Sequence, residues 1–135
     1  MNVIVCVDDR LGMLFNKRRQ SQDQVLRERL VSLCGGRPLF MGAYSAKQFA
    51  SFPPETIAVS QQFLSQAGED DWCFVEDQEL LPWKAHIKRL VLCRWNRSYP
   101  GDFFLDLPLD GMHLVSAEEF PGSSHEKITL EVYEK

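Results

Sequence analysis

The chain has 135 residues, a length that suits a single domain spanning residues 1–135. Lys and Arg total 15 against 19 Asp and Glu, a net charge of −4, which argues against a dedicated nucleic-acid-binding protein because such proteins carry a basic excess. No apolar run approaches the roughly 18 residues of a membrane span, and Asp8 and Asp9 come too early for a signal peptide, so we expect a cytoplasmic protein.

The first third of the chain alternates strand and helix patterns. "NVIVCV" (2–7) is β-branched and continuously apolar, which predicts a strand buried on both faces. In residues 21–34 an apolar stripe that starts at Leu26 recurs at helical spacing, and Gly35-Gly36 end the helix. Ser21 and Gln24 match a capping box, so we expect the helix to start there. "RPLFMG" (37–42) predicts a second buried strand.

The remaining elements are shorter, and their character changes after residue 95. We expect helices over 43–50 and 61–67, strands over 56–60, 71–77 and 87–95, and a short connection over 79–86. Residues 101–109, 112–120 and 127–135 are strand-like, with no helix between them. This order predicts an α/β domain with a mostly parallel sheet and an antiparallel edge.

Metal and disulfide chemistry have little support in the sequence. The chain has no C-x-x-C, H-x-H or H-E-x-x-H pattern, and its cysteines and histidines are widely separated. We therefore expect no metal site, and four cysteines that act as small buried hydrophobic residues in a reducing compartment. These residues are Cys6, Cys34, Cys73, Cys93, His86, His113 and His125.

Segments along nearly the whole chain resemble dihydrofolate reductase. "NVIVCVDDRLGM" is similar to that family's first strand, which runs into a mobile loop that opens with a glycine, here Gly12. "GRPLFMG" resembles its second strand, "PWKAHIKRLVLCRW" a later strand, "YPGDFF" its Gly-Asp turn and "HEKITLEVYEK" its last strand. The resemblance implies a three-layer sandwich with a mostly parallel central sheet, an antiparallel C-terminal hairpin and helices on both faces.

The cofactor positions depart from the family pattern. The family has a Gly-Gly run after the fourth strand, where the backbone approaches the NADPH pyrophosphate. Here that place reads Glu76-Asp77-Gln78, whose carboxylates would repel a polyanion by about 1 kcal/mol or more each. The arginine that follows Met-Gly in the family is Ala43. The resemblance therefore implies a degenerate NADPH site, and we expect no cofactor.

The folate positions depart in the same way. No cation stands near Pro54-Glu55, where the family pairs an arginine with the folate carboxylate. Cys93 replaces a threonine that supports the catalytic acid, and Arg27 takes the place of an aromatic side chain that stacks on the pterin. Lys17-Arg18-Arg19 replaces a Pro-Trp of the mobile loop. The fold is thus expected without dihydrofolate reductase activity.

Asp23 is the one candidate catalytic residue. It lies near the place of the family's pterin-binding acid, two residues into the expected helix and on the same side as Leu26 and Leu30. The alternative is that an acid in the first helical turn only complements the helix dipole. By contrast, we do not interpret Ser123-Ser124-His125 as part of a catalytic triad, because adjacent residues cannot assemble one without support from the fold.

The stretch "NKRRQSQD" (16–23) suggests a ligand site. In the resembled fold it would form a loop over the mouth of the substrate cleft, where guanidinium groups suit carboxylate or phosphate and glutamines can bind a heterocycle. "RWNRSYPGD" (94–102) would reach the same side. The candidate ligand-binding residues are Asn16, Arg18, Arg19, Gln20, Gln22, Arg94 and Asn96.

Three interpretations follow. The first is a reductase-like domain that binds a small anionic or heterocyclic ligand in its residual cleft. The second is a non-catalytic protein-interaction scaffold, and the third is an enzyme of different chemistry that uses Asp23. In the first, the polar stretch is an anion clamp, with a solvated basic loop as the alternative. In the second, the protein would pair through its antiparallel edge or through this basic loop. The oligomeric state stays open.

Overall fold

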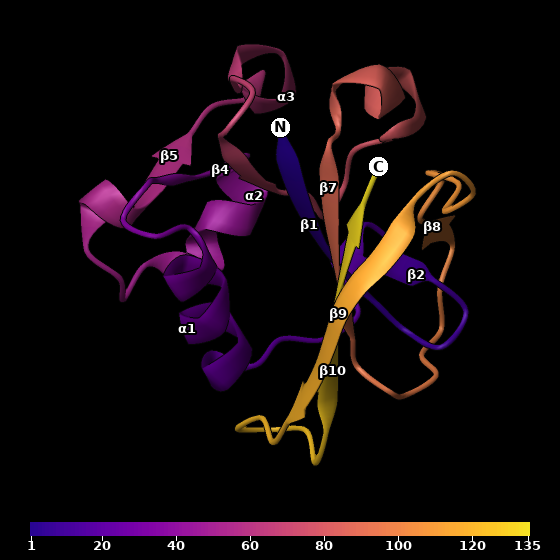
Figure 1. Ribbon diagram of the computed structural model, residues 1–135. Coiled ribbons are helices and arrows are strands. Elements are labelled where there is room, and N and C mark those ends of the chain that lie inside the picture. Colours follow the sequence, from indigo (N-terminus) through magenta and orange to yellow (C-terminus); the bar gives the residue numbers. More distant parts are fainter.

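A computed structural model describes residues 1–135 (Figure 1). None of its helices has the length and apolar character needed to cross a bilayer. The strands are β1 (Asn2–Val7), β2 (Gly12–Phe15), β3 (Arg18–Arg19), β4 (Leu39–Met41), β5 (Ile57–Val59), β6 (Trp72–Phe74), β7 (Arg89–Arg94), β8 (Phe103–Phe104), β9 (His113–Phe120) and β10 (Ile128–Glu134). The α-helices are α1 (Gln24–Leu33), α2 (Ala43–Ala46) and α3 (Phe63–Gln66), and 3-10 turns span Lys47–Phe49, Pro54–Thr56 and Leu81–His86.

Seven strands form the central sheet, in the order β5-β4-β6-β1-β7-β10-β9. The strands from β5 to β7 are mutually parallel, and β10 runs antiparallel to both β7 and β9. Figure 1 shows β9 and β10 as a long hairpin that extends away from the rest of the sheet. The expected mostly parallel sheet with an antiparallel C-terminal hairpin is therefore confirmed.

Apolar side chains cover both faces of this sheet. On one face α1 packs Leu26 and Leu30 against Ile4, and Phe49 joins them. On the other face Phe63 of α3 packs with residues of β1 and β7. The alternation of side chains along β1 divides its continuous apolar run between the two cores, which is why that run has no polar face. Helices on both faces are confirmed.

The local elements differ from the sequence expectation in several places. The helix expected over 21–34 begins at Gln24, because Asp23 and not Ser21 caps it, so the capping-box prediction is wrong. The helices expected over 43–50 and 61–67 shrink to α2 with a 3-10 turn and to α3. Within 101–109 only Phe103–Phe104 pair as a strand. These segments are rich in glutamine, serine and proline and offer few apolar residues at helical spacing. They therefore form only 3-10 turns and short helices.

A second sheet, β3-β2-β8, contains the first half of the polar stretch. Leu14 pairs with Arg19 and Phe15 with Arg18, so residues 12–19 form a hairpin in place of the expected irregular loop. Its turn residues Asn16 and Lys17 have φ values of 52° and 63°, as a two-residue hairpin turn of the primed type requires.

Candidate functional site

The candidate site lies at the carboxyl ends of β1, β6 and β7, where α1 and the segment before it face Cys6, Glu76 and Trp95. Asn16 at the hairpin tip donates its backbone N–H to the Asp102 carboxylate at 3.0 Å, which ties the hairpin to the Gly101-Asp102 turn. The Arg18 side chain is exposed, and Gln22 accepts from the Arg27 guanidinium at 3.2 Å. The first half of the polar stretch is thus part of an ordered hairpin that is fixed to the Gly101-Asp102 turn.

Arg19 forms an ion pair with Glu76, which follows β6. Arg19 Nε and Nη2 donate to the two Glu76 carboxylate oxygens at 3.0 and 3.2 Å, and Gln48 adds a third donor at 3.1 Å. The guanidinium lies 4.4 Å from the centre of the Tyr44 ring. Burial, together with the charge of Glu76, raises the pKa of the neighbouring Asp77. Because Glu76 is only 7% exposed, this pair closes the end of the cleft next to β6.

Gln20 joins the hairpin to the loop after β7. Its side-chain amide donates to Pro100 O at 3.1 Å and approaches Asp8 Oδ2 at 3.4 Å. A Cβ at Gly12 would lie 2.6 Å from the Gln20 amide nitrogen, and one at Gly101 would lie 2.9 Å from it, so a side chain at either position would displace the end of Gln20. The amide oxygen of Gln20 is buried and has no hydrogen-bond partner.

Asp23 is the most highly coordinated side chain of the site. Its carboxylate accepts five hydrogen bonds of 2.8–3.2 Å: from the backbone N–H groups of Leu26, Ser123 and Ser124, the Ser124 hydroxyl and His125 Nδ1. Burial alone would raise the pKa of Asp23, but these donors outweigh it and hold that pKa well below its usual value. Asp23 therefore caps α1 and anchors the loop before β10.

His125 extends this network toward the cleft. Nε2 lies 2.9 Å from the Ser21 hydroxyl and 3.3 Å from the Tyr99 hydroxyl, and the ring stacks on Trp95 at 4.5 Å. Ser21, His125 and Asp23 follow the hydrogen-bond order of a Ser-His-Asp triad. However, His125 is 5% exposed and the cavity beside Ser21 holds only about 10 Å³, so no acyl substrate fits in this closed arrangement.

Arg94 and Asn96 lie apart from this cluster. Arg94 binds Glu131 at 2.7 Å on the opposite face of the sheet from Trp95, because successive residues of a strand point to opposite faces. Asn96 has a φ of 59°, and its amide donates to Lys127 O and the Thr129 hydroxyl. The structure thus brings Arg19, Gln22 and Asp23 to the cleft but does not bring Arg94 there.

Arg27 lines the cleft, although it was not among the ligand-binding residues predicted from the sequence. Its terminal nitrogens donate to Gln22 and Gln24, whereas its Nε is buried without a partner. Ser21 and His125 were missed as well, since they are 104 positions apart and no local motif links them. Within the whole chain, no three His, Cys, Asp or Glu side chains gather where they could hold a metal ion.

Comparison with known proteins defines the class of fold. No protein-family profile and no curated protein sequence matches the chain. A solved structure does: dihydrofolate reductase from Enterococcus faecalis, complexed with NADP(H) and RAB-propyl, superposes with a TM-score of 0.68 over 98% of this chain and 94% of that one, at 11% identity. The chain therefore has a dihydrofolate reductase-like fold and is strongly divergent in sequence.

The Asp23 network makes stability depend on pH. Because the pKa of Asp23 is depressed in the folded state, its contribution is complete above the unfolded value near 3.8 and is lost as the pH falls. Between about pH 5 and pH 3 we expect the wild type to lose roughly 1 kcal/mol more unfolding free energy than Asp23→Asn. Urea titrations at both pH values measure this, with Glu126→Gln in the same loop as the control. Equal acid losses in wild type and Asp23→Asn would contradict it.

Proposed function

We propose that this chain is a dihydrofolate reductase-like binding domain that does not reduce folates. The Arg19–Glu76 ion pair is the observation that carries this proposal. The family brings a glycine-rich backbone to the cofactor pyrophosphate after the strand that corresponds to β6, whereas this chain has a buried carboxylate there. NADPH would have to displace Arg19 and then lie against the Glu76 charge, so the residues present do not fit the cofactor.

The cleft is proposed to take a small anionic or heterocyclic ligand once Arg19 releases Glu76. Two features support this: Arg19 would then be free to bind a ligand carboxylate or phosphate, and Arg27 Nε is a buried donor with no partner. The closed cavity of about 10 Å³ is too small for such a ligand, so the ligand occupies only the space that forms when the hairpin opens. Asn16, Arg18, Gln20 and Gln22 are then contacts from the hairpin and the segment that follows it, and a catalytic role for Asp23 stays a prediction.

The interaction-scaffold alternative would pair through the basic loop or through the outer edge of β9. Leu114 and Val115 are 52% exposed there. Proteins protect an edge strand from pairing with other chains by irregularities and by charged side chains. The β9 edge has both, a register shift opposite Val132/Tyr133 and the carboxylates of Glu118 and Glu119. The cleft, with its partnerless Arg27 donor, is therefore our first choice as the binding site.

Thermal unfolding with a ligand panel tests the proposal. We expect no shift with NADPH plus folate and no NADPH oxidation, but a shift of several degrees with one of the pterins, flavins or nucleotides near 100 times its Kd. Glu76→Gln, which removes the charge that holds Arg19 but keeps an acceptor oxygen, should increase that shift, and Arg19→Met should remove it, while Arg18→Met is the matched control. A shift with NADPH, or equal shifts in Glu76→Gln and Arg19→Met, would overturn the proposal.

A further inference from the structure

A second cavity lies at the opposite end of the sheet from the cleft beside Ser21 and Asp23, which we call the reductase cleft. Its volume is about 440 Å³, within the range of small-molecule pockets, against about 10 Å³ for the cleft. The N–H of Lys88 donates to Met1 O and the N–H of Lys135 donates to Lys88 O, which gathers the start of β1, the start of β7 and the end of β10 (Figure 1). We call this cavity the amino-end pocket; Met1, Leu64, Trp83, Ile87, Lys88 and Lys135 are among its walls.

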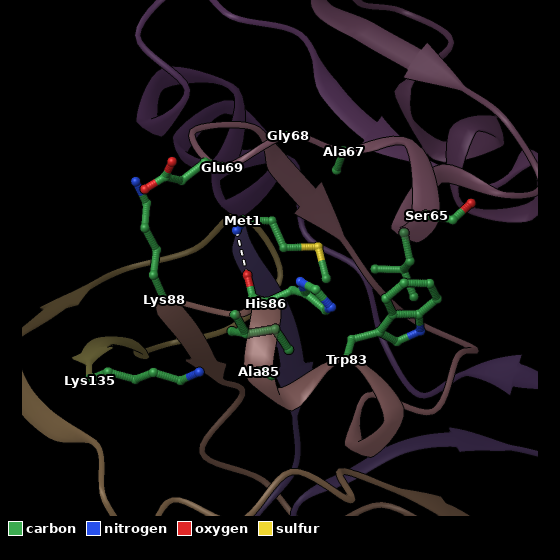
Figure 2. A pocket seen from close by; sticks show the side chains of 12 residues that line it. Met1, Ser65, Ala67, Gly68, Glu69, Trp83, Ala85, His86, Lys88 and Lys135 are labelled. Carbon is green, nitrogen blue, oxygen red and sulfur yellow. Dashed lines mark hydrogen bonds between the residues drawn. The ribbon is translucent and has the colours of Figure 1, made fainter.

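The inner wall of the amino-end pocket is apolar. Met1, Leu64 and Ile87 are 4%, 6% and 1% exposed, so they form a fixed surface that belongs to the hydrophobic core. Figure 2 shows the Trp83 indole beside the cavity, with Ala67 and Ala85 at its borders. The His86 imidazole, another lining side chain, has its ring centre 6.3 Å from that of Trp83, so the space beside the indole is bounded by a second ring.

The rim of the amino-end pocket is basic. Figure 2 shows the Lys88 and Lys135 side chains on the same side of the opening, with Lys88 extending toward Glu69, the one acidic side chain among the lining residues. Lys88 binds Asp70 at 2.5 Å, but the two side chains are 42% and 66% exposed, and exposed pairs of this kind contribute about 0–1 kcal/mol. Lys88 can therefore exchange Asp70 for a ligand anion at small cost.

The neighbouring cavity extends this environment. It holds about 250 Å³, shares Ile87 and Lys135 with the amino-end pocket, and adds Lys84 and Leu107. Lys135 Nζ donates to the Lys84 carbonyl at 2.5 Å, which places its cation where the two cavities meet. Two lysines beside an apolar wall match one negative charge better than a polyphosphate, which recruits arginines and backbone amides.

We propose that the amino-end pocket binds a small amphipathic carboxylate. Its apolar group packs against Leu64, Ile87 and Trp83, and its carboxylate lies between Lys88 and Lys135. This site is independent of the function proposed above, because it uses no residue of the reductase cleft. Hydrophobic burial supplies the affinity, and the lysines select an anion over a neutral molecule of the same shape.

Titration with 4-phenylbutyrate and with its neutral analogue 4-phenylbutanol tests this site. We expect the carboxylate to shift the Trp83 indole N–H resonance and to bind at least about fivefold more tightly than the alcohol. Lys88→Gln should remove most of that preference, and Lys47→Gln, an exposed lysine on another surface, should leave it intact. Ala85→Phe, at an exposed position of the border, should weaken both ligands more than tenfold by filling the opening.

Several outcomes would overturn this inference. They are equal affinity for acid and alcohol, tight binding that survives Ala85→Phe, or no shift of the Trp83 signal at millimolar carboxylate. Glu76→Gln separates the two proposals, because it alters the reductase cleft alone. A change in phenylbutyrate affinity in Glu76→Gln would place the ligand in the cleft and refute the amino-end pocket. If no ligand of the thermal-unfolding panel binds the cleft, the phenylbutyrate result is unaffected.

Discussion

Asp23→Ala is expected to lower the free energy of unfolding by about 3–5 kcal/mol, which corresponds to a fall in Tm of roughly 10–15 °C. The substitution leaves five donors without their acceptor: three backbone N–H groups, the Ser124 hydroxyl and His125 Nδ1. Buried donors that lose their partner retain the full desolvation penalty. Gly122 approaches the carboxylate so closely that a Cβ there would overlap it, so the loop has little room to rearrange.

Urea unfolding followed by tryptophan fluorescence measures this loss, since Trp95 stacks on His125. Asp23→Asn should lose less stability, because its amide oxygen still accepts from some of the donors. Glu126→Ala, at an exposed position in the same loop, should change stability by less than about 0.5 kcal/mol. A loss below about 1 kcal/mol in Asp23→Ala would show that the carboxylate is not what holds the loop to α1.

The regular part of this fold could be predicted from the sequence because its signal is local. The continuous β-branched run of β1 and the alternation of Ile128, Leu130 and Val132 in β10 each specify a strand and its buried face. The hairpin over 12–19 was missed because Lys17 occupies a turn position, with a φ of 63°, where glycine is the usual signal.

The site could be predicted only in part, because its contacts join distant segments. Arg19 and Asp23 stand out as charges next to an apolar helix, but nothing in the sequence pairs Arg19 with Glu76, 57 positions away, or Asp23 with His125, 102 positions away. Arg94 was grouped with Trp95 by proximity in sequence, although strand alternation separates their side chains. The family resemblance supplied the fold, and only the contacts show how the cleft is filled.

Arg19→Met is expected to lower the free energy of unfolding by about 2–4 kcal/mol, and Glu76→Gln by only about 0.5–1.5 kcal/mol. The asymmetry arises because the two partners are buried to different degrees: Arg19 is 19% exposed and Glu76 is 7% exposed. Removing Arg19 leaves a buried carboxylate with Gln48 as its remaining side-chain donor. Removing the charge of Glu76 leaves a carbonyl oxygen that still accepts from the guanidinium, which also retains its contact with Tyr44.

Chemical denaturation of the two single variants and of the double variant measures this asymmetry and the coupling between the residues. The double variant should lose less stability than the sum of the single variants, because Arg19→Met no longer leaves an unpaired charge once Glu76 is neutral. Arg18→Met, next in the chain but exposed, should be nearly neutral. Equal losses in Arg19→Met and Glu76→Gln, or strict additivity, would mean that solvent reaches the pair. In that case the cleft would be open, and the solvated Glu76 carboxylate would not exclude a dinucleotide.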